Sequence, residues 1–358
     1  NGTGNYTYTE KTEKNSAQKD TNYISINGTT ITIAANTPAD TYTYVIVATD
    51  NNSKVTKEAT YTIKIERAKT ANAGASDKTY NGTSQTGVTG TSVTWTGTTS
   101  AIDAGTYTAT ATPDGNHAWS DGTTDAKTIT WKIKPKQVAV TWGTTTTFTY
   151  NGQPQAPTVS ATSGITGETI NVTRTTGTNA GSYTSTASIS SVSGGRANKA
   201  NYTLSGNTKA FTINKVSAGN PTLSNTTKTY NGAAQYVTVS GGYGGTIYYR
   251  TSTNNSSWGS WTTTKPSLTD VGTIYVQAYV AGDGNHNNTG ATGSVTLRMN
   301  PKSVAVTWGT TTFTYNGNAQ APTATATSGV ANETINVTRT TATNAGSYTS
   351  TASISSVS

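Results

Sequence analysis

The sequence predicts an all-β chain of tandem two-sheet sandwiches that follow one another end to end as a rod. Three observations predict this fold. The chain is rich in threonine and has 20 tyrosines but one methionine, and branched and aromatic side chains suit the pleated, half-buried surface of a sheet. Apolar residues alternate with polar ones in short runs, as at Phe148 and Tyr150. Short motifs also recur along the chain, which indicates internal repeats.

Composition excludes several classes of protein. Only 11% of the 358 residues are charged and the net charge is +8, whereas a nucleic-acid-binding protein concentrates its cations on one face. We therefore expect no nucleic-acid partner. No apolar run is long enough to span a membrane, so we also expect no membrane insertion. The absence of cysteine excludes disulfides and thiol catalysis.

The densest cluster of cations consists of Lys127, Lys132, Lys134 and Lys136. These lysines alternate with apolar residues and therefore indicate the solvated face of a strand. The alternative is an anionic docking site.

Two motifs mark each repeat. The first is Thr-Tyr-Asn-Gly, and the second is an Asp or Asn followed by a glycine and a tyrosine. Thr-Tyr-Asn-Gly occurs at 79–82, 149–152, 229–232 and 314–317, and the second motif at 103–107, 179–183, 270–275 and 344–348. Residues 138–192 and 304–357 are nearly the same sequence. Gly, Pro, Asn and Ser separate the short alternating runs, as expected for a small sandwich.

These repeats predict five domains. Residues 1–67 lack the Tyr-Asn-Gly motif, and we interpret them as the later strands of an Ig- or cadherin-like sandwich. The other four are 68–134, 135–215, 216–300 and 301–358; the last lacks the two final strands that residues 193–215 are expected to form in the third. The links at 134–136, 214–217 and 299–302 are short, and proline stiffens two of them. A strand of about eight residues, with a rise of ~3.3 Å per residue, spans roughly 26 Å. With their loops, five such domains end to end predict a rod on the order of 150–200 Å long.

Four tyrosines occupy equivalent positions at the start of an alternating run: Tyr42, Tyr107, Tyr183 and Tyr348. Each lies four residues after a chain bend, so its ring can be buried while its hydroxyl returns to nearby backbone. That is the logic of the tyrosine corner of immunoglobulin-like sandwiches. Residues 270–275 depart from the pattern, because Ile274 takes the expected place and Tyr275 follows it.

The motifs resemble a known family. Tyr-Asn-Gly followed by Gln-Pro-Gln-Ala-Pro157, together with Asn-Ala-Gly-Ser-Tyr183 and Ala210–Lys215, is similar to the MBG/YDG-type bacterial immunoglobulin-like repeats of large surface proteins. The resemblance covers about residues 68–358. It implies an extracellular location, a stalk or adhesin role, and no catalytic residues.

No catalytic, cofactor or metal site is expected. His117 and His286 both lie in Asp-Gly-Asn-His motifs, which favour tight turns; a metal or acid–base role is the alternative. Calcium needs clustered oxygen ligands, and the nearest candidates, 50–52 and 283–288, lack a second acid. A Lys–Asn isopeptide crosslink would require a buried acid, and such acids look scarce.

One stretch could bind a ligand: Tyr248, Tyr249, Arg250, Trp258 and Trp261. Aromatic faces and a guanidinium can stack on sugar rings or charged groups. The alternative is that one tryptophan lies in the core between the sheets and the other caps an edge.

The incomplete last repeat allows two interpretations: the chain is a fragment, or another chain completes the sandwich by adding a strand. The expected function is that of a non-catalytic spacer in a secreted bacterial surface adhesin or extracellular filament. Its expected partners are neighbouring repeats, like chains in a filament, or host or cell-surface glycans. A glycan-binding module at 248–261 is the first alternative, and an accessory region of a secreted polysaccharide enzyme is the second.

Overall fold

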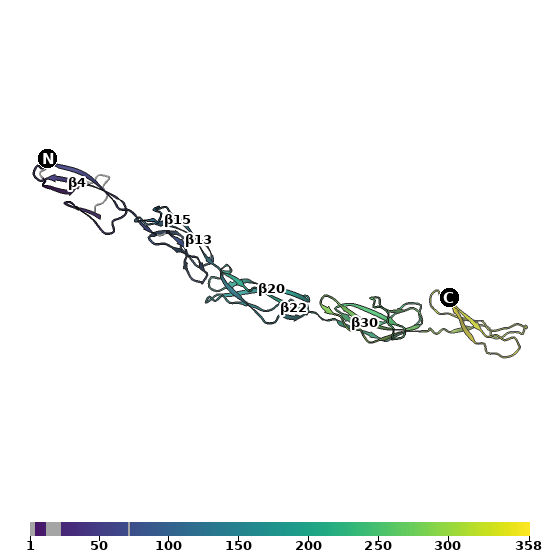
Figure 1. The fold of residues 1–358 in the computed structure, drawn as a ribbon. Helices are drawn as coiled ribbons and strands as arrows, with labels where there is room; N and C mark the ends of the chain where they lie inside the picture. Colours follow the sequence, from purple (N-terminus) through teal and green to yellow (C-terminus); the bar gives the residue numbers. More distant parts are fainter. Residues whose placement is uncertain (1–3, 12–22, 71) are drawn as a thin grey trace. The chain divides into compact units, whose positions relative to one another are not determined.

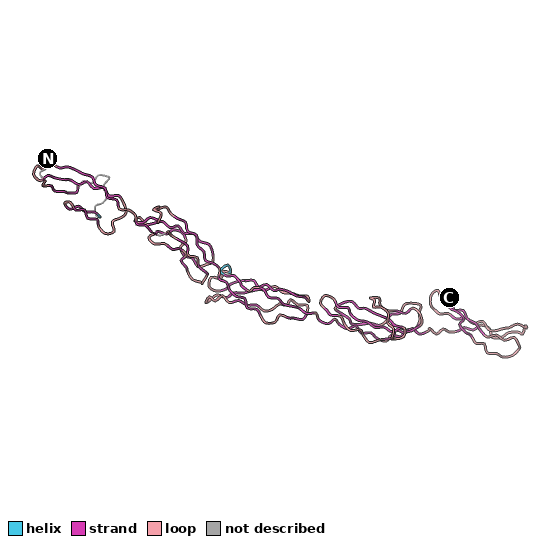
Figure 2. The backbone as a smooth tube through the Cα atoms, in the orientation of Figure 1, coloured by secondary structure: helices cyan, strands magenta, loops and turns pink. Residues whose placement is uncertain are grey.

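The computed structural model describes residues 4–11, 23–70 and 72–358. Parts of the predicted 1–67 domain, residues 1–3 and 12–22, lie outside the described residues. Strands predominate in the described residues (Figures 1 and 2), and the one helix that lies wholly within them is a single 3-10 turn, Lys199–Asn201. The predicted all-β fold of tandem sandwiches is confirmed.

The chain divides into two compact units, and the boundary runs through the third repeat. One unit holds residues 1–143, 158–175 and 186–209, and the other holds 144–157, 176–185 and 210–358. This division does not test the five predicted domains, which remain a prediction. Below, the first to fifth segments denote residues 1–67, 68–134, 135–215, 216–300 and 301–358.

In the first unit, the first segment pairs β1, β4 and β5 in one antiparallel sheet and β2 with β3 in another. Its strands are β1 (Tyr6–Glu10), β2 (Ile24–Asn27), β3 (Thr30–Ile33), β4 (Thr41–Asp50) and β5 (Thr56–Lys64). Ile24, Tyr42 and Tyr44 form its core.

The second segment is built around the sheet β11-β13-β15-β8. Its strands are β6 (Ala68–Thr70), β7 (Gly74–Ala75), β8 (Lys78–Thr79), β9 (Gln85–Thr86), β10 (Val88–Thr89), β11 (Val93–Gly97), β12 (Ser100–Ala101), β13 (Gly105–Pro113), β14 (His117–Trp119) and β15 (Lys127–Lys134). The alternation in β15 buries Trp131 and Ile133 and leaves Lys132 exposed, as strand periodicity requires.

The third segment has strands β16 (Lys136–Trp142), β17 (Thr147–Thr149), β18 (Val159–Ala161), β19 (Thr169–Arg174), β20 (Gly181–Ser193), β21 (Tyr202–Ser205) and β22 (Thr208–Asn214). In the first unit, β16 pairs with β18 and β21, and β19 pairs with β20. Val138 and Tyr202 from one sheet meet Ile170 and Val192 from the other in a single core, so two sheets close on each other. In the second unit, β22 pairs in parallel with β17.

The fourth segment lies wholly in the second unit and packs the pair β24-β27 against the sheet β25-β32-β30-β28. Its strands are β23 (Val216–Ser217), β24 (Gly219–Ser224), β25 (Thr226–Thr229), β26 (Gln235–Tyr236), β27 (Thr238–Tyr243), β28 (Gly245–Ser252), β29 (Ser267–Leu268), β30 (Gly272–Gly282), β31 (His286–Asn287) and β32 (Val295–Asn300). Val237, Tyr249, Val276 and Leu297 form its core.

The fifth segment has fewer strands. They are β33 (Val306–Trp308), β34 (Ala324–Ala326), β35 (Ile335–Arg339) and β36 (Ala352–Val357), paired as β33-β34 and β35-β36. Residues 312–314 match the β17 sequence but do not form a strand.

Candidate functional site

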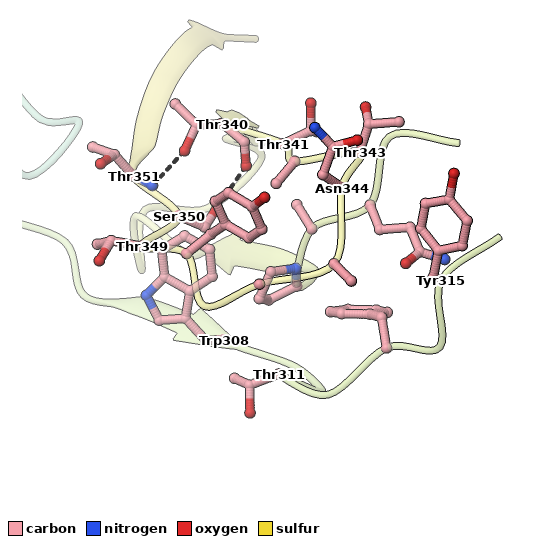
Figure 3. Close-up of a pocket in the computed structure, with 18 residues that line it drawn as sticks. Trp308, Thr311, Tyr315, Thr340, Thr341, Thr343, Asn344, Thr349, Ser350 and Thr351 are labelled. Carbon is pink, nitrogen blue, oxygen red and sulfur yellow. Dashed lines mark hydrogen bonds between the residues drawn. The ribbon is translucent and has the colours of Figure 1, made fainter. Parts of the chain in front are cut away.

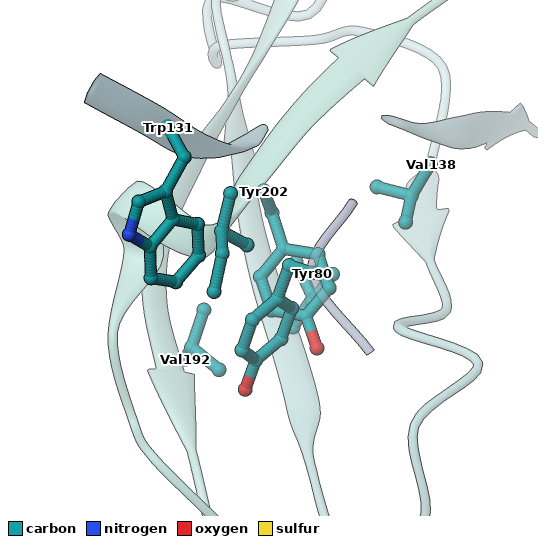
Figure 4. Close-up of a cluster of buried hydrophobic side chains, with 7 residues drawn as sticks. Tyr80, Trp131, Val138, Val192 and Tyr202 are labelled. Carbon is teal, nitrogen blue, oxygen red and sulfur yellow. The ribbon is translucent and has the colours of Figure 1, made fainter. Parts of the chain in front are cut away.

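The joint between the second and third segments contains a buried carboxylate. Glu168 Oε1 accepts a hydrogen bond from the Tyr80 hydroxyl and Oε2 accepts one from the Tyr202 hydroxyl, both at 2.5 Å. The Tyr80 and Tyr202 rings meet edge to face with centroids 5.4 Å apart (Figure 4). Tyr80 comes from the Thr-Tyr-Asn-Gly motif of one repeat, whereas Glu168 and Tyr202 belong to the next. The carboxylate therefore joins consecutive repeats.

Burial and hydrogen bonding act on this carboxylate in opposite directions. Burial favours the neutral acid, but the two tyrosine hydroxyls and the Arg196 backbone N–H favour the carboxylate, and together they hold the pKa of Glu168 below its usual value. Burial and the neighbouring carboxylate raise the pKa of Tyr80 to about 12. The tyrosines are therefore neutral donors to a charged acceptor at neutral pH, and such charge-assisted bonds are the stronger kind.

A glycine makes room for this acid. Gly195 has φ +48°, and a side chain there would place Cβ 2.5 Å from Glu168 Cγ. Any other residue at this position would displace the carboxylate.

A second polar cluster lies at the same joint. Arg196 makes a two-pronged contact with Asp103, Nε to Oδ1 at 3.2 Å and Nη2 to Oδ2 at 2.6 Å. The fully buried Asn201 donates to Asp103 Oδ1 at 2.9 Å and accepts from the Ala104 N–H at 2.6 Å. Hydrogen bonds from Arg196 and Asn201 lower the pKa of Asp103.

The hydrogen bond from the Ala104 N–H to the Asn201 side chain has counterparts at two other joints. Asn116 Oδ1 accepts from the Ala39 N–H at 3.0 Å, and Asn285 Oδ1 accepts from the Ala180 N–H at 2.8 Å. Ala39, Ala104 and Ala180 all lie at the bend that precedes a tyrosine-corner position. The same donor and acceptor therefore connect consecutive repeats at three joints.

The Asp-Gly-Asn-His motifs present two of these asparagines. Asp114 Oδ1 accepts from the Asn116 N–H at 3.0 Å, and Asp283 Oδ1 accepts from the Asn285 N–H at 2.7 Å; Asp residues commonly organise turns in this way. Each motif histidine also contacts its aspartate, at 2.6 and 2.8 Å. The His286 ring lies edge to face against Tyr150 of the preceding repeat, with centroids 5.5 Å apart.

The joint between the fourth and fifth segments repeats the tyrosine–glutamate contact. The Tyr230 hydroxyl donates to Glu333 Oε1. Sequence reasoning missed both acids. The available signal was the recurrence of Glu-Thr-Ile-Asn-Val-Thr-Arg at 168–174 and 333–339 in a chain with few charges.

Three tyrosine-corner positions return their hydroxyl to backbone. Tyr42 donates to the Pro38 carbonyl at 2.9 Å, Tyr107 to that of Asp103 at 2.6 Å, and Tyr183 to that of Asn179 at 2.8 Å. Tyr348 differs: its ring is 60% exposed, and no hydroxyl bond to the preceding bend forms within the described residues 301–358.

The predicted ligand-binding stretch is partly assembled. The Arg250 guanidinium lies over both tryptophan rings, 5.0 Å from Trp258 and 4.6 Å from Trp261. Its Nε and Nη2 donate to Gln277 Oε1 at 2.9 and 2.6 Å. Tyr248 stacks on Tyr279, which also meets the Trp261 ring edge to face at 4.7 Å. The arginine is therefore held by internal partners.

Two expectations for this stretch need correction. Tyr249 is 6% exposed and belongs to the core, because alternation along β28 turns it away from Tyr248 and Arg250. Burial also raises its pKa. Neither tryptophan is the core residue between the sheets, since both are half-buried; Tyr249 and aliphatic residues form that core.

Other predicted positions have local partners. Asp50 Oδ1 accepts from the Asn52 and Ser53 N–H groups, as in a turn. Lys127 lies 5.0 Å from the Trp119 ring and pairs with Asp121.

Within residues 4–11, 23–70 and 72–358, no three His, Asp or Glu side chains are grouped so that they could hold a metal. No helix in those ranges is long and apolar enough to cross a membrane.

Comparisons with known proteins add little. No protein-family model matches the chain, so the MBG/YDG resemblance remains a prediction. The search of curated proteins gave no match. Among solved structures, the crystal structure of Drosophila N-cadherin EC1-4 is 10% identical with a TM-score of 0.23, covering 83% of this chain and 92% of its own. A protocadherin gammaB7 EC3-6 cis-dimer structure is 12% identical with a TM-score of 0.22, covering 82% and 90%. Likeness at this level carries no conclusion about this chain, which we describe only as tandem β-sandwich segments.

Proposed function

We propose that this chain is a non-catalytic spacer segment of a secreted bacterial surface adhesin or extracellular filament, made of five sandwich domains: an Ig- or cadherin-like domain at 1–67 and four bacterial Ig-like repeats of the MBG/YDG type over 68–358. The observation that carries the proposal is the recurring joint: Asn116, Asn201 and Asn285 each accept the N–H of an alanine in the preceding repeat. A spacer needs joints that resist bending, and hydrogen bonds across short links supply that resistance.

The hydrogen bonds at these joints are expected to stabilise the contact between consecutive repeats. A net contribution of about 0.5–1.5 kcal/mol for each neutral hydrogen bond, and about 1.5–3 kcal/mol for each bond to a charged group, is typical. Across the joint between the second and third segments, bonds to the Glu168 and Asp103 carboxylates are combined with the neutral bond from the Ala104 N–H to Asn201 Oδ1. Consecutive repeats are therefore expected to move together instead of hinging freely.

Small-angle X-ray scattering of the whole chain tests the proposal. A compact globule of this length has a radius of gyration of about 20 Å, whereas the expected extended spacer gives more than twice that value. The double variant Asn201→Ala with Arg196→Ala should broaden the distribution of dimensions by loosening one joint, and Lys199→Ala on the same turn is the matched control. A radius near the compact value would contradict the spacer.

A second candidate is glycan binding by the fourth segment. The observation in its favour is the fixed position of Trp258 and Trp261 around Arg250, since aromatic faces can stack on sugars. A glycan array comparing the chain with Trp261→Ala tests it. Absence of any glycan signal that depends on Trp261 would remove this candidate.

A further inference from the structure

The second, third and fourth segments each pair an early strand with their last strand, and the two strands run parallel. The pairs are β8 with β15, β17 with β22, and β25 with β32. In each sheet the early strand lies at the edge, so that within the described residues the last strand is its only neighbour in that sheet. The early strand is therefore held to its sheet by this one pair.

The Thr-Tyr-Asn-Gly motif extends each of these parallel pairs. In all three segments the tyrosine N–H donates to the backbone carbonyl of the residue that ends the last strand. These bonds join Tyr80 to Lys134, Tyr150 to Asn214 and Tyr230 to Asn300, each at 2.9 Å. The accepting carbonyl lies at the start of the short link to the next segment. The pair therefore reaches the point where the chain leaves the segment.

The side chains of the same three tyrosines contact the segment that follows. The hydroxyls of Tyr80 and Tyr230 donate to the glutamates of the two joints already described. The Tyr150 ring meets the His286 ring edge to face. Each tyrosine thus connects to its own last strand through the backbone and to the next segment through its side chain.

Tension along the chain loads such a pair in shear. Force enters at the N-terminal end of the early strand and leaves at the C-terminal end of the last strand, and in a parallel pair these lie at opposite ends. The strands are then pulled past each other, so that all of their hydrogen bonds resist together. In an antiparallel pair the two loaded ends would lie side by side, and the bonds would break one at a time. Because each bond is individually weak, the direction of loading decides how much the pair resists.

We propose that the parallel pair and its Thr-Tyr-Asn-Gly tyrosine form a force-bearing clamp in the second, third and fourth segments. The clamp keeps a segment folded when the chain is under tension. The pair β25-β32 has four residues in register, whereas β17-β22 has three and β8-β15 has two. The fourth segment is therefore expected to resist the most. The clamp is a property of one segment, so it stands or falls separately from the spacer proposal.

The proposal does not extend to the fifth segment. The strand pairs described there, β33-β34 and β35-β36, are antiparallel. Tyr315, the counterpart of the three clamp tyrosines, lies beside a cavity of about 700 Å³ that Trp308 and Thr311 also line (Figure 3).

Single-molecule force spectroscopy of the whole chain tests the clamp of the fourth segment. The natural chain has no cysteine, so handles can be attached at Ser224→Cys, two residues before β25, and at Lys302→Cys, two residues after β32. Both positions are exposed. Load applied there passes through β25 and β32 in shear, and forced unfolding reports the unfolding barrier. We expect one high-force unfolding event.

Two proline variants differ in which side of β25 loses an N–H. The Tyr230 N–H faces β32, so by alternation the Lys228 N–H also faces β32 and the Thr227 N–H faces the open edge, where proline is tolerated. Both side chains are exposed. With the same handles, Lys228→Pro should lose the high-force event and Thr227→Pro should keep it. High force in both variants, or loss in both, would overturn the proposal.

The direction of load gives a second test that changes no residue of either strand. Handles at Ala233→Cys and Lys302→Cys pull β25 and β32 from the same end, so that the bonds of the pair open one at a time. We expect this geometry to lack the high-force event that the handles at 224 and 302 produce. Equal forces in the two geometries would overturn the proposal, because the resistance would then come from the core and not from the clamp.

Discussion

The third and fifth segments share nearly one sequence and differ in structure. Residues 182–193 and 347–358 are identical, yet β20 spans Gly181–Ser193 whereas β36 spans only Ala352–Val357. The pairs β19-β20 and β35-β36 keep the same register and the same bulge. What differs is the neighbour, because β22 lies between β17 and β20. A strand sequence of this kind is therefore ordered by its partner and not by its own propensity.

The exposed fraction of equivalent side chains also differs between the third and fifth segments. Val192 is 7% exposed and its counterpart Val357 is 55% exposed. The identical side chain is a core residue in one segment and a surface residue in the other. Val192 shares its core with Val138 of β16, Ile170 of β19 and Tyr202 of β21, so its burial is set by neighbouring strands.

The largest effect should come from removing the side chain that fills the third segment. Phe211→Ala deletes a buried ring, and we expect a loss of about 3–5 kcal/mol in the unfolding free energy of that segment. Hydrogen exchange should then speed up at 147–149 and 181–185, so that the third segment resembles the fifth. Phe313→Ala is the control, since its exposed ring should cost almost nothing; equal losses in the two variants would break the comparison.

The second-largest effect concerns the two glutamates that lie at joints between segments, Glu168 and Glu333. Glu168 accepts from two tyrosines, whereas Glu333 has only Tyr230 as a tyrosine donor in the described residues. Glu168→Gln leaves the buried Tyr80 and Tyr202 hydroxyls poorly paired, and we expect a loss of about 1–3 kcal/mol. Urea unfolding curves should show a smaller loss for Glu333→Gln. The opposite order would contradict the contacts described.

Acid should weaken the same joint. The folded-state pKa values of Glu168 and Asp103 are lowered, so the stability they contribute is present above their unfolded values, about 4.3 and 3.9. That contribution is lost as the pH falls through the folded values. Thermal unfolding between pH 7 and pH 3 should show a steeper acid loss for the natural chain than for Glu168→Gln. Parallel curves would show that the carboxylate is not coupled to folding.

The smallest effect is at the tyrosine corners. Tyr183→Phe removes the hydroxyl that donates to the Asn179 carbonyl, and we expect a loss of about 0.5 kcal/mol at this partly exposed bond. Tyr348→Phe should be neutral, because its hydroxyl lacks that partner. Denaturation midpoints of the two variants measure the difference, and a clear destabilisation by Tyr348→Phe would mean that the corner forms in the fifth segment.

Local patterns predicted the parts of the fold that depend on local chemistry. Alternation placed Trp131 and Ile133 inward and Lys132 outward, and the Asp-Gly-Asn-His motifs predicted turns that the structure contains. Alternation also separates Tyr249 from Tyr248, but it does not say which of them faces the core. That choice depends on which sheet face meets the second sheet.

Contacts between distant residues could not be predicted. Tyr80 and Glu168 lie 88 positions apart, and nothing near either residue marks it as a partner of the other. The exposure of Tyr348 was missed for a related reason, since its sequence matches that of Tyr183, and within the described residues only Tyr183 has Phe211 stacked on its ring. In both cases the missing information is tertiary and not local.

Hydrogen exchange on the intact chain tests most directly whether the partner strand decides these structures. Peptides that include Gly177 or Ala342 distinguish by mass the otherwise identical stretches 182–187 and 347–352. We predict slow exchange at 147–149 and 182–187 and fast exchange at 312–314 and 347–351. Equal protection of the two stretches in the isolated chain would contradict the account.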